Sequence, residues 1–467
     1  MAGDMVTRYA LDDGARRVDD GTVLIGGSPL SIFRLSDTGA RVLERLIVGE
    51  PPPNGAERLT ERLLDAGAIH PRPDRGPFTV ADVTVVIPVR DGDVGHVLDT
   101  IGPVGAVVVV DDGSQTPVRA PGATVIRRAV NGGPAAARNT GLAAVTTPLV
   151  AFVDADCRPE AGWLEPLLAH FADDLVGAVA PRVMSPAGRQ SPLLDRYEAV
   201  RSPLDLGATE GRVRAGTRVS YVPSAALVAR VDVLLASGGF DEDLRLGEDV
   251  DLVWRLDEQG IRVRYEPAAV VRHRPRPTLR SWLAQRVSYG RSAASLTRRH
   301  RGAVPPVAVS GWSAAVWALV GVGQPIAGVA VGVATAGALA RKLEALDHPV
   351  QESLQLVGAG HLFAGRLLAG AITRVWWPLV LPLALVSKRV RRVLLAAAVL
   401  PALVDWVRTR PAIDPLRYLV LRLLDDAAYG IGVWRGAIEH RTTEPLVPDL
   451  TSWPRPSRYD RGRSPAS

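Results

Sequence analysis

Residues 149–156 read Leu149-Val150-Ala151-Phe152-Val153-Asp154-Ala155-Asp156, five apolar residues followed by Asp-x-Asp. A continuous apolar run of this length is typical of a strand that is buried on both faces of a parallel sheet. Two carboxylates at the end of such a strand can point toward one hard cation, because Mg²⁺ and Mn²⁺ prefer oxygen ligands. Asp-x-Asp alone recurs by chance in acidic loops, so the preceding strand makes the pattern specific. We therefore predict a metal–diphosphate site that includes Asp154 and Asp156.

Apolar runs of the same kind, without the Asp-x-Asp, occur upstream at residues 83–88, 106–111 and 124–126. Residues 133–144 read as a crossover helix. Strands that alternate with helices indicate an α/β domain with a parallel sheet. In such domains ligands bind at the carboxyl ends of the strands. We expect polar residues at these ends to form the site.

Two motifs supply candidates for nucleotide binding. Residues 107–114 end in Asp111-Asp112-Gly113-Ser114, where a carboxylate can accept hydrogen bonds from a base or a ribose, although Asp-Gly-Ser is also a common turn. Residues 131–141 open a helix with Gly-Gly-Pro and place Arg138 in its first turns, where a guanidinium suits a nucleotide. A tightly packed helix start with a surface arginine explains the second motif equally well.

A fourth motif, Gly247-Glu248-Asp249, opens an amphipathic helix that continues to Leu256. Acidic residues suit a helix N-terminus, so helix capping alone is one reading. The other reading is a general base that takes a proton from an acceptor hydroxyl.

In combination these motifs closely resemble the family 2 glycosyltransferases, which are inverting enzymes with the GT-A fold. The resemblance covers roughly 190 residues, from Val83 to His273. It rests on five matching segments: residues 85–88, 110–114, 137–141, 154–156 and 248–249.

The resemblance implies a role for each motif. Asp112 would contact the uracil of a UDP-sugar, with Asp111 and Pro88 beside the nucleotide and Arg138 nearby. Asp154 and Asp156 would bind the metal and diphosphate, with Asp156 the direct ligand of Mg²⁺ or Mn²⁺. Asp249 would be the catalytic base and Glu248 would shape the acceptor side. His273 would either reach the metal or be structural. Family members often have an aromatic residue after the position of Pro88; here Val89-Arg90-Asp91 follows, so Arg90 would lie over the base instead.

Residues 1–76 are predicted to be a separate small α+β module, with strands at residues 8–11 and 22–25, a helix from Ser36, a second helix ending at Gly67 and a short strand at residues 68–70. Residues 71–77 would be the linker. The order resembles a winged helix, and the module is similar to the PqqD-like domains that bind precursor peptides in pyrroloquinoline quinone synthesis. Such a domain can capture a peptide as an added strand.

Residues 301–444 are predicted to be a mainly helical, membrane-associated region that follows the glycosyltransferase domain of residues 77–300. Residues 303–340 contain no charged side chain. This run is long enough for two membrane helices with a turn at residues 321–325. Residues 375–387 and 393–404 would be interfacial segments, with Trp376 and Trp377 at headgroup level. A buried helical bundle is the alternative. Residues 445–467 would be a disordered tail.

The composition limits the remaining classes. Hydrophobic residues make up 47% and charged residues 22%, which excludes a mostly disordered chain. The net charge is +6, but the basic residues form short clusters beside apolar runs, as in the positive-inside pattern, and not a nucleic-acid-binding face. Cys157 is the single cysteine and no secretory signal is visible, so we expect the cytoplasmic face of the membrane.

The flanking regions narrow the expected acceptor. With the N-terminal module, the segments 221–227 and 289–294 make the chain similar to the mycofactocin-system glycosyltransferases. That resemblance implies transfer of glucose from UDP-glucose to a peptide-derived redox cofactor precursor as a β-linked chain, with pathway proteins as further partners. Two alternatives stay open: a membrane-associated transferase of cell-envelope polysaccharide or glycolipid synthesis, and an inactive sugar-nucleotide-binding module. The chain has no Gln-x-x-Arg-Trp motif of processive synthases.

Overall fold

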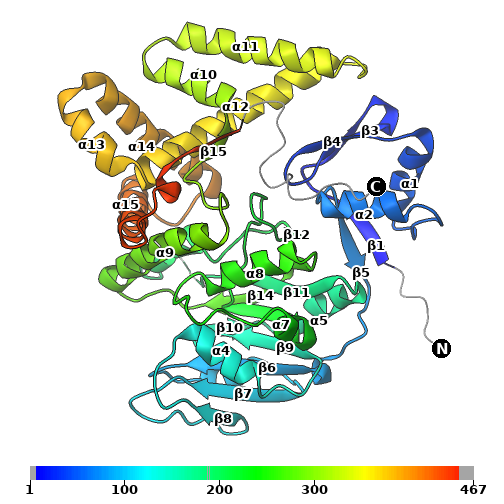
Figure 1. Cartoon of the computed structure of the whole chain (residues 1–467), viewed down its shortest axis with the longest axis vertical. Coiled ribbons are helices and arrows are strands. Elements are labelled where there is room, and N and C mark those ends of the chain that lie inside the picture. The colour runs from blue at the N-terminus through cyan, green and yellow to red at the C-terminus, as the bar shows by residue number, and fades with distance from the viewer. Residues whose placement is uncertain (1–6, 187, 189, 452–467) are drawn as a thin grey trace. The chain divides into compact units, whose positions relative to one another are not determined.

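The computed structural model describes residues 7–186, 188 and 190–451 (Figure 1). The chain divides into two compact units. The first contains residues 1–188 and 201–275, and the second contains residues 189–200 and 276–467.

The first unit begins with the small α+β module. Its elements are β1 (Thr7–Leu11), β2 (Arg16–Val18), β3 (Val23–Gly26), β4 (Ser31–Arg34), α1 (Asp37–Ile47), α2 (Glu57–Asp65) and β5 (Ile69–Pro73). β1 pairs with β5, and β2, β3 and β4 form an antiparallel sheet. The Ser36 hydroxyl accepts a hydrogen bond from Gly39 N and starts α1, as predicted. The predicted strands and helices are confirmed, while β5 extends into the predicted linker.

A nine-stranded mixed sheet forms the centre of the first unit, in the order β10-β14-β11-β13-β9-β6-β7-β8, with β12 paired to β14. β6 (Val83–Val89), β7 (Ala106–Asp111), β8 (Thr124–Arg127) and β9 (Leu149–Val153) are parallel, which confirms the four predicted strands. The sheet then continues through β10 (Cys157–Pro159), β11 (Val176–Met184), β12 (Gly211–Arg212), β13 (Ala226–Arg230) and β14 (Arg262–His273). β13 is antiparallel to both of its neighbours, so the sheet is mixed and not purely parallel.

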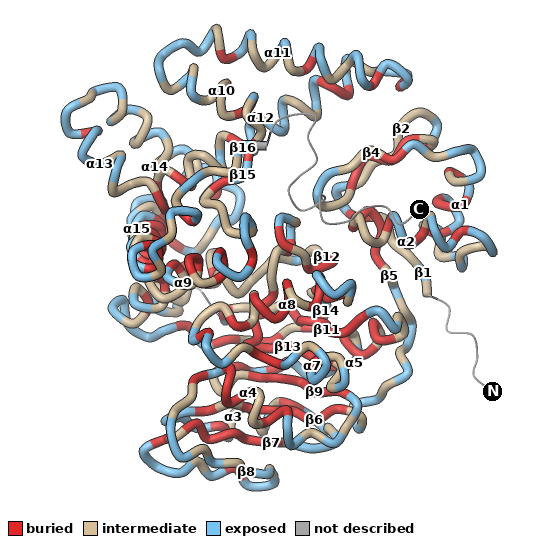
Figure 2. Tube along the Cα trace, viewed as in Figure 1, coloured by how far each residue is buried: buried red, intermediate tan, exposed pale blue. Residues whose placement is uncertain are grey.

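Helices cover this sheet, and its central strands are buried (Figure 2). All five residues of β9 are buried, as a strand covered on both faces requires. α4 (Pro134–Leu142) contacts β6 and β7, and α8 (Glu248–Glu258) contacts β14. The other α-helices of this unit are α3 (Gly95–Leu98), α5 (Leu164–Ala169) and α7 (Val231–Ala236), whereas α6 (Leu193–Arg201) belongs almost wholly to the second unit.

The second unit is mainly helical. It contains α9 (Leu279–Arg299), α10 (Gly311–Gly321), α11 (Pro325–Lys342), α12 (Pro349–Arg374), α13 (Trp377–Val386), α14 (Lys388–Thr409) and α15 (Pro415–Glu439), with β15 (Ala308–Ser310) paired to β16 (Asp449–Thr451). β16 lies within the predicted tail, whose residues 452–467 are outside the described part of the chain. A buried ionic cluster joins Arg286 of α9 to Glu198 and Asp425.

α9 and α15 lie side by side at very close range (Figure 1). A Cβ atom on Gly290 would come within 2.0 Å of the Tyr429 carbonyl oxygen, and one on Gly432 within 2.0 Å of the Val287 carbonyl oxygen. Because no real Cβ tolerates such a distance, glycine is required on both helices. Backbone packs directly on backbone at this crossing.

The prediction of two membrane helices within residues 303–340 is wrong. α10 has 11 residues, which corresponds to about 16 Å and is half of the roughly 30 Å needed to cross the hydrocarbon core. α11 has 18 residues, but its last turn contains Arg341 and Lys342. In the described part of the chain, α12 is the one helix long and apolar enough to cross a membrane, and it lies downstream of the predicted run. The turn between α10 and α11 is where it was expected.

Candidate active site

The carboxyl ends of β6, β7 and β9 gather the candidate donor-binding residues at one edge of the sheet. Asp91 follows β6, Asp112 follows β7, and Asp154 follows β9. The first two loops are held together, since Asp91 N donates to Ser114 Oγ at 2.9 Å and Gln115 N donates to Asp91 Oδ1 at 2.8 Å. The parallel strands therefore place these motifs next to one another, as predicted.

Asp111 and Asp112 have different surroundings. Asp111 is completely buried, and its carboxylate accepts hydrogen bonds from Ser114 N at 2.8 Å and Val118 N at 3.2 Å. Burial opposes ionisation of Asp111, but these hydrogen bonds outweigh it and lower its pKa. The carboxylate of Asp111 therefore holds its own turn.

Asp112 joins the turn after β7 to the glycine-rich segment before α4. Its two carboxylate oxygens accept hydrogen bonds from Gly132 N at 2.9 Å and Gly133 N at 2.8 Å. Arg128 adds an ion pair at 2.9 Å. Gly133 has a φ of 93°, which glycine adopts without strain, and this explains the Gly-Gly-Pro sequence.

Arg138 is buried and connects the Asp-x-Asp motif to the Glu248-Asp249 motif. Its guanidinium donates to Asp154 Oδ1 at 2.7 Å and to Glu248 Oε1 at 2.8 Å, and lies over the Phe240 ring at 5.4 Å. Burial opposes the charge on Arg138, but Asp154 and Glu248 outweigh it and raise its pKa. The alternative of a surface arginine is wrong.

Glu248 and Asp249 form the first turn of α8, after Gly247 with a φ of 81°. Burial raises the pKa of Glu248 to about 7, and the neighbouring charge of Asp249 adds to this, while Arg138 opposes it. Asp249 is less buried, and its Oδ2 accepts a hydrogen bond from Ser224 N at 3.2 Å. The backbone of the 221–227 segment thus holds the Asp249 carboxylate.

Asp156 and His273 approach each other at the edge of the sheet, with 3.5 Å between Asp156 Oδ2 and His273 Nε2. Cys157 pairs with His273 in the register of β10 and β14, which fixes this proximity. Within the described ranges no group of three His, Cys, Asp or Glu side chains could enclose a metal ion. Asp154 Oδ1 is bonded to Arg138, and the Asp156 carboxylate and the His273 imidazole are the candidate metal donors that lie closest together here. Burial raises the pKa of Cys157 well above its ordinary value, which leaves a thiol and not a thiolate.

Pro88 and Arg90 lie where β6 ends. Pro88 is half-buried, whereas Arg90 is exposed and lies 3.5 Å from Asp91 in an ion pair. The Arg90 side chain thus lies outside the core, at the exposed edge of the candidate nucleotide site.

Two residues that the motifs did not single out as site residues hold the loop before α8. Asn139 binds the Phe240 backbone twice: Phe240 N donates to Asn139 Oδ1 at 2.9 Å, and Asn139 Nδ2 donates to the Phe240 carbonyl at 2.8 Å. Arg255 donates to the carbonyls of Ser237 and Gly239 at 2.6 and 2.7 Å. For Asn139, the sequence signal was its place in segment 137–141, which matches the family. For Arg255, there was no signal in the sequence beyond its place in the α8 motif.

Comparison with known proteins identifies the family of the chain. The family model for glycosyl transferase family 2 matches residues 96–231. The pre-mycofactocin glycosyltransferase of Mycobacterium tuberculosis, in strains CDC 1551 and H37Rv, is 43% identical over 461 residues, which cover 94% of this chain and 97% of the relative. Succinoglycan biosynthesis protein ExoU of Rhizobium meliloti is 34% identical over 175 residues, or 34% of this chain and 50% of that protein.

Among solved structures, the mannosyltransferase PcManGT from Pyrobaculum calidifontis, in complex with GDP-Man and Mn²⁺, covers 70% of this chain and 89% of its own, with 20% identity and a TM-score of 0.36. The sequence identity to the mycobacterial proteins extends over nearly the whole of both chains. The protein is a glycosyltransferase with a GT-A domain, and it belongs to the pre-mycofactocin glycosyltransferases within glycosyl transferase family 2.

Proposed function

We propose that the protein transfers glucose from UDP-glucose to a mycofactocin precursor with inversion at the anomeric carbon, building a β-linked oligoglucoside. The observation that carries the proposal is the identity of 43% to the pre-mycofactocin glycosyltransferases over 94% of the chain. The site agrees with it, since Arg138 brings the donor motif at Asp154 and the acceptor motif at Glu248 to one guanidinium.

In the proposed reaction the acceptor hydroxyl attacks the anomeric carbon in one displacement. The new bond joins the acceptor oxygen to the anomeric carbon, the bond to the diphosphate oxygen breaks, and UDP leaves. Asp249 takes the proton from the hydroxyl. Asp112 and Arg90 would recognise the base, with Pro88 and Asp111 forming the floor and the turn of the nucleotide site.

Asp156 and His273 would hold Mg²⁺ or Mn²⁺. The Asp156 carboxylate supplies the oxygen ligand that such an ion prefers, and the His273 imidazole lies 3.5 Å from it as a second donor. When bound, the ion would neutralise charge on the departing diphosphate. Asp154, paired with Arg138, would line the phosphate side.

Replacing Asp156 with alanine is expected to weaken the binding of UDP about 10-fold in the presence of Mn²⁺ and to leave its binding in EDTA unchanged. The reason is that the variant removes one of the two proposed protein ligands. Calorimetric titration of UDP with and without Mn²⁺ measures this. Asp243→Asn, at an exposed aspartate, is the control. Equal affinity of the Asp156→Ala variant and the wild type in Mn²⁺ would remove Asp156 from the metal site.

The N-terminal module would present the peptide-derived acceptor or a pathway protein. In its three-stranded sheet β2 and β4 are the outer strands, each paired with β3 alone. An outer strand offers backbone groups to an extended peptide.

The function is tested by incubating the purified protein and Mn²⁺ with a panel of UDP-sugars, with and without the mycofactocin precursor, and reading products by mass spectrometry. Hexose additions that need both UDP-glucose and the precursor are expected. Donor hydrolysis without transfer would leave a glycosyltransferase with another acceptor, and a cell-envelope glycan would then become the leading one.

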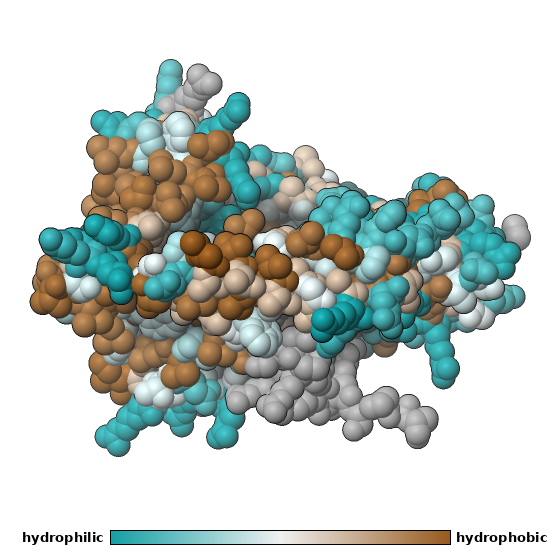
Figure 3. All heavy atoms as spheres, turned by 90° about the horizontal axis from the view of Figure 1, so that it is seen from above, coloured by the Kyte–Doolittle hydropathy of each residue, from teal (hydrophilic) through white to brown (hydrophobic). Residues whose placement is uncertain are grey.

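We also propose that the second unit binds the cytoplasmic face of the membrane. Large apolar side chains are exposed on its helices, including Leu362, Phe363, Leu385 and Val386, and brown surface marks such residues in Figure 3. Exposed apolar area on this scale indicates an interaction surface. α13 has 10 residues, too few to span, and four exposed basic residues follow it: Lys388, Arg389, Arg391 and Arg392. Short apolar helices beside basic residues favour binding in the plane of an anionic lipid surface.

Changing those four basic residues to glutamine is expected to weaken binding to phosphatidylglycerol vesicles at least 10-fold, because each contributes about 1 kcal/mol near an anionic surface. Vesicle flotation at physiological salt measures this. The control variant changes four exposed arginines of the N-terminal module to glutamine, Arg34, Arg41, Arg45 and Arg58, and so alters the net charge equally. Equal losses of vesicle binding in the two variants would mean that the net charge, and not the position of the basic residues, causes the loss. Unchanged flotation of both variants would argue against membrane binding through the basic residues after α13.

A further inference from the structure

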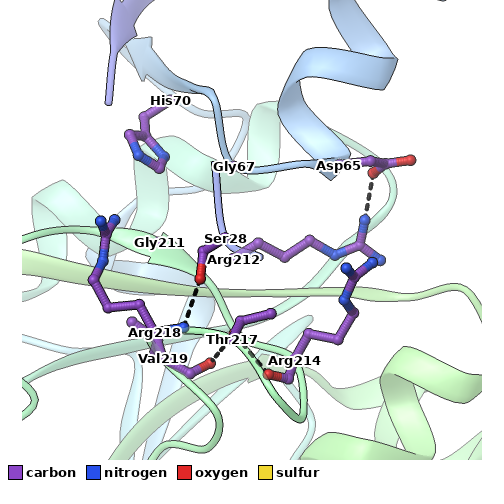
Figure 4. Close-up of a pocket in the computed structure, with 10 residues that line it drawn as sticks. All are labelled: Ser28, Asp65, Gly67, His70, Gly211, Arg212, Arg214, Thr217, Arg218 and Val219. Atoms are coloured by element: carbon purple, nitrogen blue, oxygen red, sulfur yellow. Dashed lines mark hydrogen bonds and ion pairs between the residues drawn. The ribbon is translucent and has the colours of Figure 1, made fainter. Parts of the chain in front are cut away.

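A single segment of the first unit, residues 208–224, contacts both the N-terminal module and helix α8. We call it the connecting segment. At its module end, the Arg218 guanidinium donates to Asp12 Oδ2 at 2.6 Å and to Asp12 Oδ1 at 3.3 Å. The backbone N–H of Arg218 donates to Ser28 Oγ at 2.6 Å, as the dashed line in Figure 4 shows. The module thus binds Arg218 through both the side chain and the backbone of that residue.

The Asp12 side of this contact is buried. The Asp12 side chain is 3% exposed and also lies 2.9 Å from His70 Nε2. Burial opposes ionisation of Asp12, but the hydrogen bonds from His70 and Arg218 outweigh it and lower its pKa. A buried carboxylate that loses one of its partners is destabilised. The Arg218 side chain is 38% exposed, so this cost lies on the Asp12 side of the contact.

A second arginine of the connecting segment has one partner in the module and one in α8. Arg212 pairs with Asp65 of α2 and donates to Asp257 of α8 at 2.9 Å. Figure 4 shows Arg212 reaching Asp65 beside the Arg218 turn. The same guanidinium therefore links the module to the helix that begins with Glu248 and Asp249.

The turn that contains Arg218 is closed by its own hydrogen bonds. Arg214 N donates to the Val219 carbonyl at 3.0 Å, and the Thr217 hydroxyl lies 2.6 Å from the Arg214 carbonyl and 2.9 Å from the Val219 carbonyl. Because the turn is closed, a shift of Arg218 moves the residues that follow it.

Those following residues hold the candidate base. The Ser220 carbonyl accepts a hydrogen bond from Trp254 Nε1 of α8 at 2.7 Å. Four residues later, Ser224 N donates to Asp249 Oδ2 at 3.2 Å. The path from Asp12 to Asp249 consists of one ion pair that is buried on its Asp12 side, one closed turn and two hydrogen bonds to α8.

We propose that Arg218 and Arg212 are positioning residues through which the N-terminal module sets the orientation of Asp249, so that the module acts on the transfer step as well as on acceptor capture. The inference rests on the proposed function, in which Asp249 is the base. A misplacement of about 1 Å in a catalytic group can cost up to 100-fold in rate, so a contact remote from the chemistry is able to control it.

The first test is kinetic. Arg218→Ala is expected to lower kcat for transfer about 10-fold while the KM for the donor and the Kd for UDP stay within twofold. Asp12→Asn should lower kcat similarly, and the double variant should be no slower than the slower single variant, because both single variants remove the Arg218–Asp12 ion pair. Arg218→Lys, which keeps the charge, should recover part of the loss. Arg45→Ala is the control, since Arg45 forms an exposed ion pair with Glu50 inside the same module.

The second test does not depend on activity. In hydrogen exchange of the full chain, Arg218→Ala should accelerate exchange in peptides covering residues 219–224 and 248–255, and Arg45→Ala should not. A variant with normal exchange in both peptides and kcat within twofold of wild type would overturn the inference. If wild type transferred no sugar from any donor, the proposed function would fail, while the exchange result would still decide the structural connection.

Discussion

Asp249→Asn is expected to lower the turnover of glycosyl transfer by about 1,000-fold, within the range of 10² to 10⁴ that a positioned general base supplies. Asparagine has nearly the same shape and can still accept the hydrogen bond from Ser224 N. It cannot take a proton from the acceptor hydroxyl. The loss should therefore appear in kcat, and the Kd of UDP, measured by calorimetry, should change by less than twofold.

The matched control is Asp243→Asn, which makes the same chemical change at an exposed aspartate and should leave turnover unchanged. Near-normal turnover in Asp249→Asn would mean that another group takes the proton. Glu248 would then be tested next, because its pKa of about 7 is suited to proton transfer near neutral pH.

Arg138→Met is expected to lower the free energy of unfolding by about 3–5 kcal/mol, the usual cost of removing one partner from a buried ion pair. Methionine fills part of the space but leaves the carboxylates of Asp154 and Glu248 facing each other across the gap. Urea unfolding of the full chain measures the change. Arg45→Met is the control, because the Arg45–Glu50 pair is half exposed and its loss should cost less than about 1 kcal/mol.

The pH dependence of that loss tests whether it is ionic. The pKa of Glu248 in the folded protein is already raised above its ordinary value, and removing the guanidinium raises it further. A carboxyl whose pKa is raised on folding binds more protons in the folded state, so stability falls as pH rises from the unfolded pKa through the folded one. The destabilisation should be larger at pH 8 than at pH 5. Equal losses at the two pH values would indicate that packing, and not charge, is responsible.

Much of the sheet could be predicted because its signals are local. Each of the four parallel strands is a continuous apolar run, and the residues that follow it must reach the same edge of the sheet. Ser36 and the Gly-Gly-Pro segment mark helix starts for reasons of capping and backbone geometry that hold in any protein. The motif residues at strand ends were found for this reason.

What could not be predicted depends on contacts between distant residues. Arg138 and Glu248 are 110 positions apart, and no local pattern pairs them. The same holds for Arg218 and Asp12, which are separated by 206 positions. Adjacent aspartates look equivalent in the sequence, yet Asp111 holds its own turn and Asp112 binds the glycine-rich segment. Apolar composition at residues 303–340 predicted the run and its turn, but not that α10 would be only 11 residues long and that α11 would end in Arg341 and Lys342.

The crossing of α9 and α15 determines where this protein can be shortened. Gly290 and Gly432 place the two backbones in direct contact. A chain that ends anywhere between α9 and α15 would therefore leave the backbone of α9 around Gly290 without the helix that covers it. Expression of a shorter enzyme should therefore continue through Glu439, because a stop before Leu279 would also remove Arg286, the buried partner of Glu198. Removal of α10–α14 would require an internal deletion with a linker that rejoins α9 to α15, and not a simple C-terminal truncation.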